Sequence, residues 1–186
     1  MRRFLGLKQH LLQGLSCPEA DGLVHAAVLI VIAHRDEPSI LLTLRSRQLR
    51  MHSGQVAFPG GRIDDCDAGL SHAALREAEE EVGLSPSFVN VLGAMPSFPT
   101  LTGFRMFPVV GVLESVPSLV LEPAEVDEAF WLPVSFMMNH ENYSERKIIH
   151  ENQELVSPVL KYQGYDIWGA TARVLLSLRL LMERNS

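Results

Sequence analysis

The sequence has 186 residues, 47% of them hydrophobic, which is enough for an ordinary globular domain with its own core. Sixteen basic residues against twenty-two acidic ones leave a formal charge of −6, which argues against a broad nucleic-acid-binding surface. A small anionic ligand remains compatible with this charge if a metal ion or a few arginines neutralise it locally. We therefore expect one domain over residues 1–186, with a small molecule and not a nucleic acid as its partner.

The apolar pattern predicts the first elements in chain order. A stripe near the N-terminus predicts a short surface helix, and its members are Phe4, Leu7, Leu11, Leu12 and Leu15. Residues 25–34 are typical of a buried strand, and residues 39–46 of its hairpin partner, with a turn at 35–38. The Gly- and Asp-rich residues 57–69 predict a loop.

A helix is predicted next over residues 71–82, capped by Ser71 and ended by Gly83. The later predictions are strands at 88–95 and 105–114, a strand passing into a helix at 129–139, and a strand or turn followed by an amphipathic helix at 165–184. Strands and helices mix without a regular βαβ repeat. This order predicts an α/β or α+β sandwich and not a doubly wound sheet.

The C-terminal helix carries an apolar stripe that includes Val174, Leu175, Leu178 and Leu181. Such a stripe buries itself against the rest of the chain or against a second copy. Packing within the monomer and formation of a homodimer are both open at this point.

The cysteines and the apolar runs indicate a location. Cys17 and Cys66 have neither zinc-site nor CxxC spacing, which favours two free thiols in a reducing compartment. The longest apolar run, residues 26–33, is too short to cross a bilayer. We expect a cytoplasmic protein with no membrane partner; an amphipathic organellar presequence is the alternative, because the first acidic residue is Glu19.

The predicted helix over residues 71–82 carries a run of glutamates. Glu77, Glu80 and Glu81 stand at i, i+3 and i+4, so they share one helix face, while Glu79 points elsewhere. Three carboxylates on one face repel each other, and a hard cation such as Mg²⁺ or Mn²⁺ would remove that repulsion. A solvated charged face is the alternative, and this segment alone favours that alternative.

The residues before this helix favour the metal site over the solvated charged face. Two adjacent glycines, Gly60 and Gly61, let backbone approach an ion closely. The loop and helix together resemble the box of the Nudix family, G-x5-E-x7-R-E-U-x-E-E-x-G-U, where U is bulky and apolar. The matching residues are Gly61, Arg76, Glu77, Glu80, Glu81, Gly83 and Leu84. The sequence departs from the box in three ways: Asp67 replaces the early Glu, the next spacer has one extra residue, and Ala78 is small for U.

A second pattern precedes the box. Residues 41–61, "LLTLRSRQLRMHSGQVAFPGG", match every fixed position of the pattern LLTxR(S/A)x3Rx3Gx3FPGG, which marks coenzyme A pyrophosphatases within the Nudix family. Residues 103–111 and 168–173 resemble later segments of that subfamily more weakly. The resemblance implies a Nudix-type α/β/α sandwich with a mixed sheet. It also implies hydrolysis of coenzyme A or a derivative to 3′,5′-ADP and 4′-phosphopantetheine, or its acylated form, with Mg²⁺ or Mn²⁺.

The resemblance also implies roles for individual residues. It makes Glu80 and Glu81 metal ligands and Glu77 a ligand or the general base, with Arg76 orienting Glu77. The carbonyl of Gly60 is a further candidate ligand, as is a later acid, for which we prefer Glu125 over Glu128.

The substrate side has fewer assignments. Arg45 and Arg50 are candidate phosphate-binding residues together with Gly61, because arginine donates two parallel hydrogen bonds to a phosphate. For each arginine the alternative is a surface side chain paired with a carboxylate, and for Glu125 it is a solvated acidic loop. His52 is a solvated loop residue or a further substrate contact.

Two rival functions remain at this stage. One is a Nudix hydrolase of another nucleoside diphosphate derivative, such as ADP-ribose. The other, of a different class, is a non-catalytic protein that binds coenzyme A or a nucleotide on the same fold. The presence of all four of Arg76, Glu77, Glu80 and Glu81 argues against the second.

Overall fold

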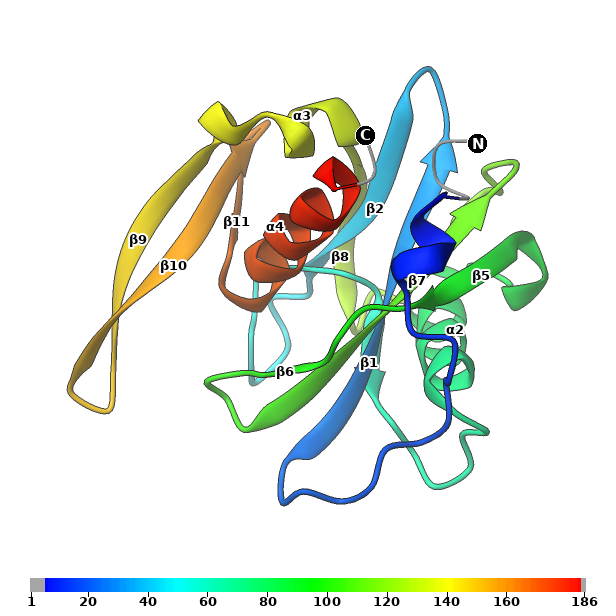
Figure 1. The fold of residues 1–186 in the computed structure, drawn as a ribbon, viewed down its shortest axis with the longest axis horizontal. Coiled ribbons are helices and arrows are strands. Elements are labelled where there is room, and N and C mark those ends of the chain that lie inside the picture. The colour runs from blue at the N-terminus through cyan, green and yellow to red at the C-terminus, as the bar shows by residue number, and fades with distance from the viewer. Residues whose placement is uncertain (1–5, 185–186) are drawn as a thin grey trace.

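A mixed sheet forms the centre of the structure (Figure 1). The computed structural model describes residues 6–184, and within these residues eight strands form one sheet in the order β3-β2-β1-β7-β5, with β4 added at β1, β6 at β7 and β8 at β2. Its strands are β1 (Val24–His34), β2 (Pro38–Arg45), β3 (Val56–Ala57), β4 (Gly60–Arg62), β5 (Val89–Ala94), β6 (Phe98–Pro99), β7 (Phe104–Leu113) and β8 (Val126–Pro133).

A smaller sheet and six helical segments complete the described part of the chain. The smaller sheet has the order β11-β10-β9, from β9 (Tyr143–His150), β10 (Gln153–Tyr162) and β11 (Tyr165–Trp168). The α-helices are α2 (Leu70–Val82), α3 (Val134–Met138) and α4 (Gly169–Glu183), and the 3₁₀ turns are η1 (Gly6–His10), η2 (Pro86–Phe88) and η3 (His140–Asn142).

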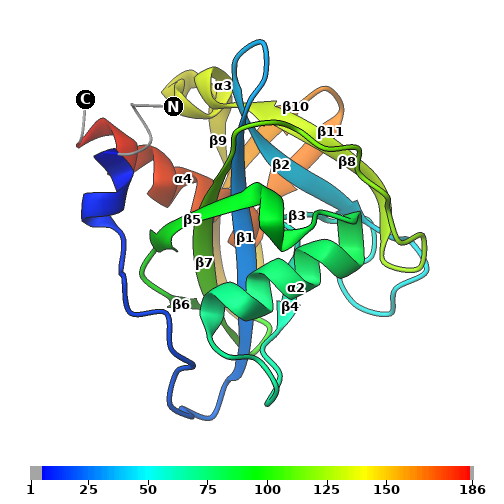
Figure 2. The same ribbon diagram turned by 90° about the vertical axis from the view of Figure 1, so that its right-hand side faces the viewer.

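Strand β1 organises the two layers around the sheet. It pairs in parallel with β7 and antiparallel with β2 and β4, which makes the sheet mixed. Since successive side chains point to opposite faces of a strand, Val28 and Ile30 join the core that contains α4, whereas Leu29 and Val31 join the core that contains α2. The two helices cover opposite faces (Figures 1 and 2), and the predicted α/β sandwich with a mixed sheet is confirmed.

Helix α2 begins one residue earlier than predicted and has a different cap. Ser71 lies inside the helix, so its prediction as the cap is wrong; the N-cap is Gly69, without a side-chain cap bond. The amide of Leu70 donates to the carbonyl of Leu15 (2.8 Å), and a Cβ at residue 69 would lie 2.3 Å from that oxygen. The backbone carbonyl of Leu15 therefore caps the first turn of α2, and Gly69 leaves the room that this carbonyl needs. Gly83 ends the helix in the left-handed conformation, as predicted.

The N-terminal apolar stripe is only partly helical. η1 ends at His10, and the amide of Leu12 donates to the carbonyl of Ala94 (2.8 Å). The prediction of a helix that includes Leu12 is therefore wrong, because the chain satisfies its backbone groups against β5 instead. Leu7 and Leu11 are buried, whereas Leu12 is exposed. Phe4 lies outside the described residues.

The segment predicted as a loop at 57–69 contains strand β4. Gly60 pairs with Val28 of β1 and has a φ of 151°. A Cβ at this position would lie 2.4 Å from the carbonyl oxygen of Ala27. The glycine therefore lets this short strand lie against β1, directly before α2.

The hairpin of β9 and β10 is absent from the predicted elements. It extends away from the main sheet (Figure 1). Its turn holds Glu151 and Asn152 at positive φ (49° and 61°). Such turns usually contain glycine, so the sequence lacks the ordinary hairpin signal here.

Helix α4 buries its stripe within the chain. Val174, Leu175 and Leu178 are buried in the core on its side of the sheet, and Leu181 packs against that core. Packing within the chain therefore accounts for this stripe. None of the helices in residues 6–184 is long and apolar enough to cross a membrane.

Candidate active site

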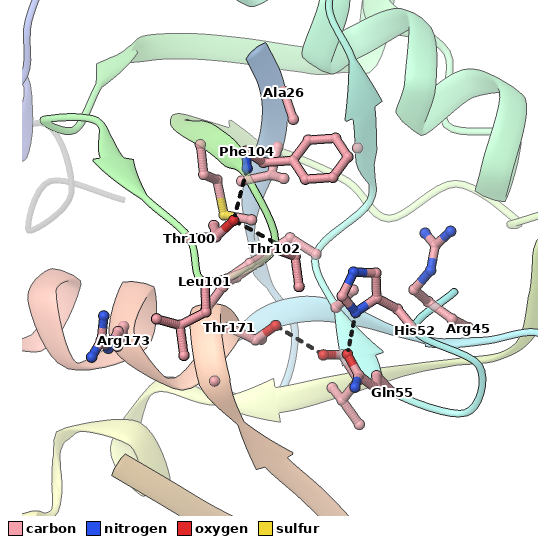
Figure 3. Close-up of a pocket in the computed structure, with 18 of the residues that line it drawn as sticks. Ala26, Arg45, His52, Gln55, Thr100, Leu101, Thr102, Phe104, Thr171 and Arg173 are labelled. Carbon is pink, nitrogen blue, oxygen red and sulfur yellow. Dashed lines mark hydrogen bonds between the residues drawn. The ribbon is translucent and has the colours of Figure 1, made fainter. Parts of the chain in front are cut away.

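A cavity of about 910 Å³ lies between the main sheet and the smaller one (Figure 3). We define its carboxylate wall by Gly60, Gly61, Glu77, Glu81 and Glu125, which come from β4, α2 and the residues before β8. We define its distal wall by Leu101, Ile148, Ile149, Trp168 and Arg173, which come from the turn before β7, the β9–β10 hairpin, the end of β11 and the first turns of α4.

Glu81 is the most buried acid of the carboxylate wall, with only 2% of its surface exposed. The amide of Gly60 donates to its Oε2 (3.1 Å), and Arg45 Nη1 donates to its Oε1 (3.4 Å). Burial raises the pKa of Glu81 to about 7, and the charges of Glu125 and Glu77 add to the rise against the effects of Gly60 and Arg45. Such a carboxylate favours a neighbouring positive charge.

Glu77 lies beside Glu81 on the same wall. Arg76 Nη1 donates to its Oε1 (2.9 Å). Burial raises the pKa of Glu77 above its ordinary value, and Arg76 opposes that rise. A Cβ at residue 61 would lie 2.3 Å from Glu77 Oε2, so Gly61 makes the room that this carboxylate occupies.

Arg76 itself is held by Asp67, whose side chain is fully buried. Arg76 Nε and Nη2 donate to the two oxygens of Asp67 (3.1 and 3.0 Å), and the amide of Asp64 and the ring of His72 also contact it (2.8 and 2.7 Å). The hydrogen bonds from Arg76 hold the pKa of Asp67 well below its usual range. Asp67 thus fixes Arg76, and Arg76 in turn fixes Glu77.

The other two glutamates of the run are not among the residues that line the cavity. Glu79 and Glu80 are both exposed, and Glu80 accepts a hydrogen bond from Arg76 Nη1 (3.2 Å). The structure therefore brings Glu77 and Glu81 into the cavity but leaves Glu80 at its edge, beside the same arginine.

The other predicted site residues also divide into those that line the cavity and those that do not. Arg45 lines the cavity and contacts Glu81, whereas Arg50 is exposed and is not among the lining residues. Gly61 and Glu125 line the cavity; Glu128 does not, and it accepts a hydrogen bond from Tyr165 (2.6 Å). His52 lines the cavity with its Nδ1 2.9 Å from Gln55 Oε1 (Figure 3).

Sequence reasoning missed the distal wall. Leu101, Ile148 and Ile149 carry no motif that marks them as cavity residues. The one available signal was residues 168–173, where Trp168 and Arg173 are the first and last members. That resemblance located the segment without assigning any of its side chains.

The carboxylate wall fits a hard cation by its donor set. Within residues 6–184, no three His, Cys, Asp or Glu side chains already converge as metal ligands. Three carboxylates nevertheless face one cavity, and Glu125 and Glu77 lie near enough to raise the pKa of Glu81. Oxygen donors that repel one another suit Mg²⁺ or Mn²⁺.

Comparison with known proteins extends these observations beyond the motifs. Residues 23–152 match the family model described as NUDIX domain. A protein from Escherichia coli O1:K1, described as an uncharacterized Nudix hydrolase NudL, is 41% identical over 155 residues, which cover 83% of this chain and 81% of that protein. A protein of the same description from Shigella boydii serotype 18 matches to the same extent.

Solved structures share the fold. A Nudix hydrolase from M. smegmatis, RenU, has a TM-score of 0.53 at 22% identity, over 67% of this chain and 81% of that one. An Ap4A hydrolase from C. elegans has a TM-score of 0.52 at 18% identity, over 59% of this chain and 80% of that one. At these identities the two structures establish the arrangement of elements alone.

Proposed function

Because the chain belongs to the Nudix hydrolase family, we propose that it hydrolyses the pyrophosphate bond of coenzyme A or a derivative. The products are 3′,5′-ADP and 4′-phosphopantetheine, or acyl-phosphopantetheine from an acylated substrate. One observation carries this proposal: the coenzyme A pattern at residues 41–61 places Arg45, Gly60 and Gly61 on the same cavity as Glu77 and Glu81. This shared cavity supports a single site for the pattern and the carboxylates.

Nudix hydrolases generally use divalent metal ions, and we assign Mg²⁺ or Mn²⁺ to the carboxylate wall. Glu77, Glu80, Glu81, Glu125 and the carbonyl of Gly60 are the proposed ligands. When bound, such an ion neutralises the pyrophosphate oxygens and lowers the pKa of a coordinated water.

The chain's own groups position the reactants around this charge. Asp67 and Arg76 hold Glu77, which serves as a ligand or as the base that accepts a proton from the attacking water. Arg45 offers its guanidinium to a phosphate oxygen of the substrate. As water adds to one phosphorus, the bond to the bridging oxygen breaks and the second phosphate leaves.

The direct test is product analysis. Purified protein is incubated with coenzyme A and Mn²⁺, and the products are separated by liquid chromatography with mass detection. We expect equal amounts of 3′,5′-ADP and 4′-phosphopantetheine. An absence of both products, with rapid turnover of ADP-ribose, would move the assignment to another nucleoside diphosphate derivative.

The C. elegans protein is described as an Ap4A hydrolase, so Ap4A is an alternative substrate to test. The pattern at residues 41–61 favours coenzyme A over that alternative. Tight binding of coenzyme A without turnover at any metal concentration would instead support the non-catalytic alternative.

We propose that residues 1–186 act as a single domain. Cys17 and Cys66 are both exposed and are not joined in a disulfide, which suits a reducing compartment such as the cytoplasm.

A further inference from the structure

The distal wall contains an arginine, Arg173, that forms no ion pair with the described acids of the carboxylate wall. Arg173 lies in the first turns of α4 and lines the cavity. Figure 3 places it on the far side of the cavity from Arg45 and His52. Arg45 contacts Glu81 of the carboxylate wall, so Arg173 lies across the cavity from that contact (Figure 3).

The backbone that carries Arg173 is anchored at two points. The buried hydroxyl of Thr171 donates to the carbonyl of Val56 on β3 (2.8 Å). The amide of Gly169 donates to the hydroxyl of Ser157 on β10 (3.1 Å). Arg173 therefore extends from a fixed helical turn, which is the arrangement that favours a defined contact with a ligand.

The three arginines that line the cavity differ in what they contact. Arg45 has Glu81 as a partner, whereas Arg62 has no ion pair within 4.0 Å in the described part of the chain but follows Gly61 of the carboxylate wall in β4. Arg173 forms no ion pair within 4.0 Å among residues 6–184, although acidic residues outnumber basic ones in the chain. Within the described cavity lining, Arg173 is thus the arginine that has no ion pair and belongs to the distal wall.

We propose that Arg173 binds a terminal phosphate on the part of the substrate that lies away from the pyrophosphate, and so determines specificity. This inference rests on the proposed function. In coenzyme A the pyrophosphate must lie at the carboxylate wall, and the one remaining anionic group is the 3′-phosphate of the ribose. A guanidinium donates two parallel hydrogen bonds to such a group, and Arg173 provides that guanidinium at a distance from the reacting phosphates.

Steady-state kinetics with coenzyme A and with 3′-dephospho-coenzyme A tests this role. For the wild-type protein we expect the KM for coenzyme A to be about tenfold lower than that for 3′-dephospho-coenzyme A, since hydrogen bonds to charged groups contribute about that factor or more. Arg173→Ala should raise the KM for coenzyme A to the KM for 3′-dephospho-coenzyme A. It should leave kcat for coenzyme A, and both constants for 3′-dephospho-coenzyme A, unchanged. Arg173→Lys should restore part of the preference.

Arg184→Ala is the matched control, because Arg184 is an exposed arginine at the other end of α4 and does not line the cavity. It should leave both KM values unchanged. The inference is overturned if the wild-type protein shows no preference between the substrates, or if Arg173→Ala impairs both equally.

A binding measurement separates this inference from the proposed function. Calorimetry with 3′,5′-ADP and with 5′-AMP needs no turnover. We expect the wild-type protein to bind 3′,5′-ADP more tightly, and Arg173→Ala to bind the two equally. Failure to hydrolyse coenzyme A would refute the proposed function, whereas equal wild-type affinities for the two nucleotides would refute the role of Arg173.

Discussion

The two walls of the cavity are built in different ways. Most of the carboxylate wall comes from one continuous stretch, residues 60–81, in which β4 leads into α2. The distal wall joins Leu101, the β9–β10 hairpin and the start of α4, which are far apart in the sequence. The difference indicates that the residues proposed for chemistry are specified locally, whereas those proposed for substrate selection depend on the assembled fold.

The sharpest test of the carboxylate wall compares two neighbouring glutamates. Glu79 and Glu80 are both exposed, but only Glu80 belongs to the proposed metal ligands. Glu80→Gln should lower kcat by about 1,000-fold with the fold retained, since the site loses a charge needed in the reaction. Glu79→Gln should stay within about twofold of wild type. Equal activities of the two variants in a metal-supplemented assay would remove Glu80 from the site.

The second prediction concerns the support behind the carboxylate wall. Asp67→Asn removes the charge of a fully buried acid that binds Arg76, so unfolding in urea should show a loss of about 3 kcal/mol. Asp65→Asn is the control, because Asp65 is exposed in the same loop, and it should change stability by under about 0.5 kcal/mol. A similar small effect at both positions would show that Asp67 does not organise the wall.

The pH dependence of that stability follows from the same contact. The native pKa of Asp67 is lowered by Arg76, whereas in the unfolded chain it should lie near about 3.9. The contribution of the Asp67–Arg76 contact to the free energy of unfolding is therefore fully present above about pH 4, and it is lost as the pH falls toward the native pKa of Asp67. The stability difference between the wild-type protein and Asp67→Asn should narrow between about pH 4 and pH 3. A difference that widens on acidification would contradict this assignment.

The smallest expected effect is a change in KM from a substitution in the distal wall. Ile149 is 82% exposed and lines the cavity from the hairpin. Ile149→Ser should raise KM by about threefold with kcat unchanged, since it removes uniform binding and no reacting group. Val156→Ser offers a control, because Val156 is exposed on the same hairpin but does not line the cavity. A large fall in kcat for Ile149→Ser would show that the two walls are not functionally separate.

The limits of prediction follow the same division. Strand β1 could be predicted because apolar side chains occupy both of its faces, and the end of α2 because Gly83 adopts a conformation that glycine favours. The cap of α2 could not, because its acceptor is the backbone of Leu15, far away in the sequence. The β9–β10 hairpin could not either, because its turn contains Glu151 and Asn152 without glycine.

The same reasoning applies to the site. Helical spacing brought Glu77 and Glu81 to one face, but it does not say how deeply each is buried, so Glu80 at the edge was not distinguished from them. A linear pattern likewise does not reveal which arginine reaches the cavity. Arg45 lines it, Arg50 is outside it, and Arg173 enters from a different element.

The central claim is tested most directly by competition between coenzyme A and ADP-ribose in one reaction with Mn²⁺. The ratio of the two initial rates at equal low concentrations gives the ratio of kcat/KM. We predict that coenzyme A is consumed first, by at least about tenfold, and that Glu81→Gln abolishes both reactions. Consumption of ADP-ribose while coenzyme A stays intact would contradict the account.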